Sequence, residues 1–211
     1  MNYYRLRDVK TPPFAYLLNQ DEVIRSCHRC DMPLEQMGGG LRVEICALDS
    51  YGGYAEYRGM PMMADYWLIG DEAVRADLER LLPGGFQVVP IHAIMNTASK
   101  GQVPPPAPGG RQTAPASFYC FTPTRRIDLD PDLMRAFPPL WCAECHRHIP
   151  NIPIDFQPLP AAPSRDCSVA SLRHLYLEGY DYLFHEAVAA QLQSLFPQMI
   201  LEKLATEPIN L

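Results

Sequence analysis

The chain has 211 residues, of which 47% are hydrophobic and 20% charged, a balance typical of a globular protein that can bury a core. Its formal net charge of −6 argues against a protein that binds nucleic acid directly through a basic patch. No segment reaches the roughly 18 consecutive apolar residues of a membrane-spanning helix, and the first residues, MNYYRLRDVK, contain no apolar signal region. We therefore expect a cytoplasmic protein that has no membrane partner.

Strands dominate the predicted elements at the start of the chain. Residues 3–7 form a short alternating run that is typical of a strand. In residues 41–48 (LRVEICAL), apolar side chains alternate with Arg42 and Glu44, which is the period of a half-buried strand. Residues 65–70 (DYWLIG) are expected to form a buried strand.

The strongest helix signal follows directly, in DEAVRADLERLLPGG at residues 71–85. Its apolar side chains recur at helical spacing and would share one face, which comprises Val74, Leu78, Leu81 and Leu82. Asp71 and Glu72 lie at the N-terminus, where the helix dipole favours negative charge, and Pro83 begins the segment that ends the helix. A further strand is expected over residues 86–94.

Two proline-rich loops interrupt the second half of the chain, which contains many of its 22 prolines. Residues 101–116 (GQVPPPAPGGRQTAPA) cannot hold a helix or a central strand. A strand is expected over residues 117–121, and a short helix over residues 130–137, where an aspartate precedes a proline at the first helical position. The second loop spans residues 149–163.

The C-terminal segment, DYLFHEAVAAQLQSLFP, is predicted to be one helix that Asp181 caps and Pro197 ends. Its apolar side chains would again share one face, which comprises Phe184, Val188, Leu192 and Leu195. Residues 198–204 (QMILEKL) are expected to form a closing strand.

Strands and helices mix without the regular βαβ alternation of a parallel sheet, and no internal repeat is visible. The predicted class is therefore α+β, with mixed strands and a few helices. We expect one domain over residues 1–211, either undivided or with two lobes, 1–100 and 117–211, that the loop 101–116 joins.

Two Cys-x-x-Cys pairs are the most specific motif in the sequence. SCHRCD contains Cys27 and Cys30, and WCAECH contains Cys142 and Cys145. A two-residue spacer lets both sulfurs reach one metal ion, and two such pairs complete the tetrahedral Cys₄ site that is typical of structural Zn²⁺. The sequence therefore predicts a structural zinc in a zinc-ribbon-like element that is built from two distant CxxC knuckles.

The long interval between the pairs leaves other arrangements open. His146 and His148 follow the second pair and could replace a cysteine ligand. Each pair could instead perform thiol redox chemistry, although neither is predicted to open a helix in a thioredoxin-like unit. Because cytosolic thiols are kept reduced, two like pairs favour a metal over a redox function. The single cysteines are expected to be small buried side chains; they are Cys46, Cys120 and Cys167.

The usual catalytic motifs do not occur in the sequence. There is no Gly-x-Ser-x-Gly, no Gly-x-x-x-x-Gly-Lys and no Gly-x-Gly-x-x-Gly. HEAVA begins like a zinc-protease helix but has Ala189 in place of the second histidine, so His185 is interpreted as helix surface. Trp67 and Trp141 are interpreted as core residues. We expect no enzymatic activity and no catalytic residues.

Four segments together carry a resemblance to a known family. They are MNYYRLR ahead of an early cysteine pair, DYWLIGDEAVRADLERLLPGG in the middle, a late cysteine pair, and DYLFHEAVAAQLQSLFPQMILEKL at the end. In this combination the chain resembles the double-CxxCG immunity proteins, a myxobacterial-type family that protects cells against a delivered toxin. It departs from that pattern at Asp31 and His146, which occupy the glycine positions. Glycine there would ease the backbone turn of a knuckle.

The resemblance implies a non-enzymatic protein that binds a cognate toxin and neutralises it by occlusion. It assigns no toxin-contacting residues. A net charge of −6 permits complementarity with a basic toxin surface. The alternatives are a zinc-ribbon interaction or adaptor module and, less favoured, a CxxC redox protein.

Overall fold

The computed structural model describes the chain in fifteen stretches: residues 3–9, 14–19, 24–29, 33–36, 40–46, 58–64, 67–96, 111–113, 117–127, 135, 138, 140–146, 148–149, 168–172 and 182–204. In the described part of the chain, mixed strands combine with two helices, which agrees with the predicted α+β class. Of the helix expected over residues 130–137, the structure describes only Arg135, which is helical. The rest of that segment and most of the loop expected over residues 149–163 lie outside the described residues.

The chain divides into two compact units whose segments alternate along the sequence. We call one the barrel unit; it comprises Asp8–Val23 and Met37–Thr122. We call the other the sheet unit; it comprises Met1–Arg7, Ile24–Gln36 and Pro123–Leu211. These boundaries differ from the lobes 1–100 and 117–211 considered from the sequence, because the first half of the chain contributes two segments to the sheet unit.

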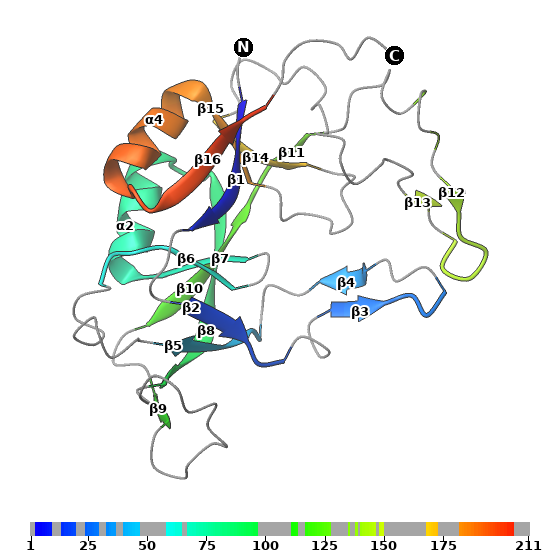
Figure 1. Cartoon of the computed structure of the whole chain (residues 1–211), viewed down its shortest axis with the longest axis horizontal. Coiled ribbons are helices and arrows are strands. Elements are labelled where there is room, and N and C mark those ends of the chain that lie inside the picture. The colour runs from blue at the N-terminus through cyan, green and yellow to red at the C-terminus, as the bar shows by residue number, and fades with distance from the viewer. Residues whose placement is uncertain are drawn as a thin grey trace. The chain divides into compact units, whose positions relative to one another are not determined.

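Six strands of the barrel unit close into a ring (Figure 1). In order they are β10 (Phe118–Pro123), β7 (Trp67–Asp71), β6 (Met62–Ala64), β2 (Phe14–Leu17), β5 (Arg42–Cys46) and β8 (Phe86–Asn96). The ring closes because β8 pairs with β10 as well as with β5. Strand β9 (Arg111–Thr113) pairs with β8 and ends the sheet, so the loop predicted over residues 101–116 contains a short edge strand.

Burial confirms the strand periods that were expected in the barrel unit. Val43 and Ile45 of β5 are 0% and 1% exposed, and every residue of β7 is buried. Glu44 differs from the prediction, because it was expected on a polar face and is only 8% exposed. Tyr16 of β2 and Ile94 of β8 stand beside it in register on the two neighbouring strands, which reduces its access to solvent.

Helix α2 (Glu72–Leu81) begins where the sequence predicted, and the structure identifies Asp71 as its N-cap. The Asp71 carboxylate accepts hydrogen bonds from the backbone N–H groups of Ala73 and Val74, at 3.0 and 3.1 Å. Its second oxygen accepts the N–H of Gly59 at 3.0 Å, so the same side chain also holds the preceding turn. Gly70 permits the close approach of β7 to the helix, since a Cβ atom at this position would lie 2.6 Å from the Val74 side chain.

The sheet unit is organised around five strands, which Figure 1 shows with helix α4 (Glu186–Leu195) beside β16. In order they are β11 (Arg126–Ile127), β14 (Val169–Leu172), β15 (Tyr182–His185), β1 (Tyr3–Val9) and β16 (Met199–Lys203). Helix α4 contacts β15 and β16, and its Val188 and Leu192 are buried. In the described part of the chain, no helix is long and apolar enough to cross a membrane.

The C-terminal helix starts later than the sequence predicted. Residues 182–185 form strand β15, so Phe184 is buried in the sheet and not on a helix face. The cap is His185, whose Nδ1 accepts the Ala187 N–H at 3.3 Å. Leu195 was expected on the buried face but is 37% exposed. The strand prevails because Tyr182–His185 pairs with β1 and β14, a tertiary contact that the helical period cannot reveal.

We predict that Asp71→Ala destabilises the protein by about 2–3 kcal/mol, because the substitution removes a helix cap and leaves the Gly59 N–H without its acceptor. Chemical denaturation measures this difference. Asp77→Ala is the matched control on the same helix: its exposed carboxylate pairs only with Arg80 among the contacts shown, at 2.9 Å, so we expect a loss of about 0.5 kcal/mol or less. Equal losses in the two variants would contradict the assignment.

Candidate metal centre

Two small hairpins of the sheet unit carry the cysteine pairs. In the first, β3 (Ile24–Ser26) pairs with β4 (Pro33–Gln36), and Cys27 directly follows β3. In the second, β12 (Leu140–Trp141) pairs with β13 (His148–Ile149), and Cys142 directly follows β12. Each cysteine pair therefore begins where a strand ends, and in the second hairpin the turn also holds Cys145.

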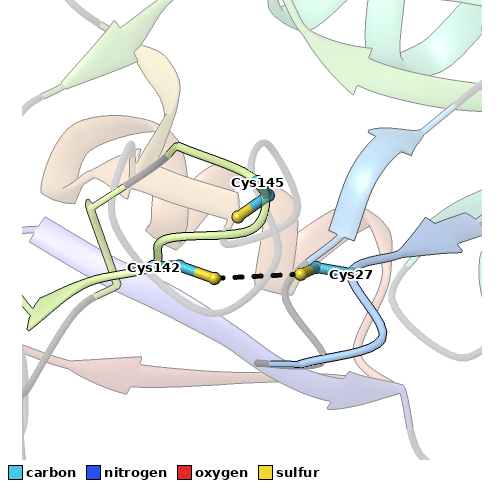
Figure 2. A group of neighbouring side chains, drawn as sticks. All are labelled: Cys27, Cys142 and Cys145. Atoms are coloured by element: carbon cyan, nitrogen blue, oxygen red, sulfur yellow. Dashed lines mark hydrogen bonds between the residues drawn. The ribbon is translucent and has the colours of Figure 1, made fainter.

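Three of the four predicted ligands lie together. The sulfurs of Cys27 and Cys142 are 3.9 Å apart although 115 residues separate them in sequence, and Figure 2 shows that they face each other. The Cys145 sulfur joins them, and all three sulfurs lie within 4.8 Å of one another. In a tetrahedral site with Zn–S bonds of about 2.3 Å, neighbouring sulfurs are about 3.8 Å apart. The Cys27–Cys142 distance is therefore close to that of two sulfurs bound to one ion, and much longer than the ~2.05 Å of a disulfide.

The surroundings of the three thiols suit a metal centre. Cys27 and Cys142 are each 3% exposed, and Cys145 is partly exposed. None of them is in a disulfide. Thiolate sulfur is a soft ligand that Zn²⁺ and other thiophilic ions prefer. The three cysteines can therefore hold a metal ion.

The remaining predicted ligands have different outcomes. Cys30 and the side chain of His148 lie outside the described residues, so their part in the site stays a prediction. His146 is described but is not in the group of potential ligand atoms within 4.8 Å of one another. Its ring instead contacts that of Trp141, with the ring centroids 6.0 Å apart. Among the described residues, the ligand set is therefore made of sulfur alone.

The backbone at the second knuckle explains why a glycine would suit position 146. His146 has a φ of 54°, in the left-handed region, and it is the only non-glycine residue with positive φ in the described part of the chain. Its N–H donates to the Cys142 carbonyl oxygen at 3.0 Å, which closes the turn around the two cysteines. The left-handed conformation costs a residue with a Cβ atom about 1–2 kcal/mol. Asp31, the other departure from the glycine pattern, lies outside the described residues.

The two tryptophans have opposite environments. Trp67 is 0% exposed, which confirms its interpretation as a core residue. The same interpretation was wrong for Trp141, which is 56% exposed beside Cys142. Among the described strands, its hairpin pairs with no further strand. Leu140, the residue before it, is 55% exposed.

Cys120 lies in the barrel unit and belongs to a different class of thiol. It is 0% exposed, as expected for a small buried side chain. Burial raises the pKa of its thiol to about 12, because the apolar surroundings disfavour the thiolate. Cys120 therefore stays protonated at neutral pH and is a poor ligand or nucleophile. Cys167 and the side chain of Cys46 lie outside the described residues.

A second polar cluster lies on the surface of the barrel unit. The Arg75 guanidinium donates two hydrogen bonds from Nε to the Glu72 carboxylate, at 2.9 and 3.0 Å, and lies 5.7 Å from the centre of the Tyr119 ring. The hydrogen bond from Arg75 holds the pKa of Glu72 at about 2, so this carboxylate is ionised at neutral pH. The spacing of Glu72 and Arg75 is visible in the sequence, whereas Tyr119 joins them only through the pairing of β10 with β7.

We predict that His146→Gly stabilises the protein by about 0.5–1 kcal/mol, because glycine adopts positive φ without the steric cost that histidine pays. The expected gain is smaller than the full steric cost, since the unfolded chain becomes more flexible and the Trp141 contact is lost. Denaturation midpoints measure it. Glu144→Gly, an exposed position in the same turn without positive φ, is expected to be neutral or destabilising. A stability loss in His146→Gly would contradict the interpretation.

Comparison of the chain with known proteins adds no family assignment. No protein-family model matches it, and no curated protein or solved structure shows significant similarity to it. Function must therefore be inferred from the geometry of the three thiols and from the motif that contains them.

Proposed function

We propose that the chain is a zinc-stabilised, non-enzymatic binding protein that protects its cell by occluding a toxin. The observation that carries the proposal is the convergence of Cys27 with Cys142 and Cys145 from two distant CxxC motifs. Cys30 would complete the set, because the two-residue spacer from Cys27 allows both sulfurs to reach the same ion. A site of four thiolates is closed and leaves no position for a substrate, so the ion would be structural.

The grouping of the thiols favours metal binding over redox catalysis. Redox-active CxxC pairs typically sit at the N-terminus of a helix, which lowers the pKa of the attacking thiol. Cys142 instead follows strand β12 and lies in the turn of a hairpin. In addition, the Cys27 sulfur lies 3.9 Å from the Cys142 sulfur. A redox-active pair needs only two sulfurs, so a third sulfur at this distance favours a metal site.

A structural ion would serve a binding protein by fixing its surface before the partner arrives. An isolated two-stranded hairpin is marginally stable at best, and among the described strands neither β3–β4 nor β12–β13 pairs with a further strand. An ion that joins them would reduce the ordering cost of binding. This use of the ion, together with the double-CxxC pattern, supports the immunity function that the family resemblance implies.

A zinc-ribbon adaptor remains the second candidate, and one observation favours it. Leu140 and Trp141 are exposed directly beside Cys142, and large apolar side chains of this kind often anchor protein–protein contacts. Both candidates therefore use the metal centre as a frame for an interaction surface. They differ in the partner, which is a delivered toxin in one case and a resident cellular protein in the other.

We predict that the protein as isolated contains about one Zn²⁺ per chain and that Cys27→Ser loses it. Structural zinc sites supply folding free energy, so the variant should show a lower melting temperature and lose protection through partial unfolding. Elemental analysis and thermal denaturation measure the two effects. Cys120→Ala is the control, because Cys120 lies in the barrel unit, outside the cluster of three thiols, and should leave the metal content unchanged. A stable, metal-free and fully protective Cys27→Ser would contradict the structural role.

We further predict that affinity purification of the tagged protein from its own host recovers one stoichiometric partner with a toxin-like domain linked to secretion. Mass spectrometry identifies the partner, and reconstitution from purified components measures the inhibition of its activity. Recovery of housekeeping proteins alone would favour the adaptor. A tagged variant without the metal centre, Cys27→Ser, is the matched control for binding that depends on the folded site.

A further inference from the structure

The three clustered thiols differ in their access to solvent. Cys27 and Cys142 are each 3% exposed, whereas Cys145 is partly exposed in the turn between β12 and β13. Small oxidants react with thiolates, and the reaction is selective for thiolates that solvent can reach. Among these three described thiols, an oxidant from solvent therefore reaches the Cys145 sulfur most readily.

We propose that Cys145 is the site at which peroxides oxidise this cluster, and that Cys142 is the thiol that resolves the product. The inference rests on the proposed function, because the thiols that react are the ligands of the proposed metal centre. It adds a modification site to that centre, with hydroperoxides as the chemical class of the oxidant.

The chemistry takes place in two balanced steps. The Cys145 thiolate attacks one oxygen of hydrogen peroxide, the O–O bond breaks, and the products are a sulfenic acid on Cys145 and hydroxide. The Cys142 thiolate then attacks the Cys145 sulfur, an S–S bond forms, and the S–O bond breaks to release a second hydroxide. Two thiolates are oxidised by two electrons, one peroxide is reduced, and two protons from solvent convert the hydroxides to water.

The position of Cys142 makes it the better resolving thiol. It lies three residues from Cys145 in one turn, which the hydrogen bond from His146 N–H to the Cys142 carbonyl oxygen closes. The two sulfurs already lie within 4.8 Å of each other, so they reach bonding distance by adjustment inside that turn. The Cys27 sulfur also lies within 4.8 Å of the Cys145 sulfur. Cys27 follows β3 in the other hairpin, however, so a bond to it would join two hairpins and not close within one turn.

The disulfide between Cys142 and Cys145 would remove two ligands from the metal centre. It consumes both sulfurs of the second knuckle and leaves Cys27 without its contact to a Cys142 thiolate. The affinity of the remaining ligands for the ion falls, and the segment Ile24–Gln36 loses its link to the turn at Cys142. Oxidation would therefore couple peroxide to release of the metal and to loosening of the first hairpin.

Peroxide titration of the protein as isolated tests the order of events. With limiting hydrogen peroxide and dimedone, which traps sulfenic acids, we expect the first adduct on Cys145. Without dimedone, trypsin should yield the peptide of residues 136–147, which contains both Cys142 and Cys145, lighter by two hydrogens. The absorbance of a zinc-sensitive dye should report one ion released per disulfide formed.

Matched variants and cross-links decide between the alternatives. Cys142→Ser removes the resolving thiol and should increase the dimedone adduct on Cys145 severalfold, while buried Cys120 stays unmodified as an internal control. A first adduct on Cys27 or Cys142 would overturn the proposal. A cross-link between the tryptic peptides 26–29 and 136–147 would overturn it as well, since it identifies Cys27 as the resolving thiol. Absence of zinc in the isolated protein would contradict the metal centre itself, whereas the adduct map would still decide the order of oxidation.

Discussion

The contact between the Cys27 and Cys142 sulfurs, 3.9 Å apart, is the constraint on which the organisation of the sheet unit depends. It joins two hairpins that share no backbone pairing with each other or with the five-stranded sheet among the described strands. Neither hairpin is expected to be stable alone in water. If an ion occupies the thiol cluster, its binding free energy becomes folding free energy for the elements that it joins, as in other small metal-stabilised folds.

The path of the chain adds an entropic cost that the contact between Cys27 and Cys142 helps to offset. Residues 24–36 belong to the sheet unit, although barrel-unit segments precede and follow them in sequence. The chain therefore leaves one unit and returns to it within a short span, which costs conformational entropy that the three residues of β3 and their partners in β4 offset only in part. A metal ion bound between Cys27 and the second knuckle would contribute its binding free energy to folding at this position. The barrel unit does not depend on a metal ion in this way, because β8 pairs with β10 and closes the ring with backbone hydrogen bonds.

In the proposed function, the metal centre would be a structural frame and the side chains beside it a binding surface. Cys27 and Cys142 are buried, whereas Trp141 and Leu140 next to Cys142 are 56% and 55% exposed. Such a division would suit a protein that acts by binding, because the ion would fix the geometry of the turns that carry the exposed side chains. Cys145 is the exception, because it is partly exposed, and it is therefore the thiol at which we propose that oxidants react.

The sequence by itself determined those features that depend on local spacing. Alternation identified β5. Helical spacing and the acidic N-terminus at Asp71 and Glu72 identified α2, and the two-residue spacers indicated the cysteine pairs as candidate metal ligands. It could not determine that Tyr182–His185 is a strand, because pairing with β1 outweighs the helical period of those residues. Nor could it show that Trp141 is exposed, since burial depends on which elements pack around a hairpin. The convergence of Cys27 with Cys142 was a hypothesis from spacing, and only the tertiary structure decided it, because 115 residues of intervening chain set the distance between the two sulfurs.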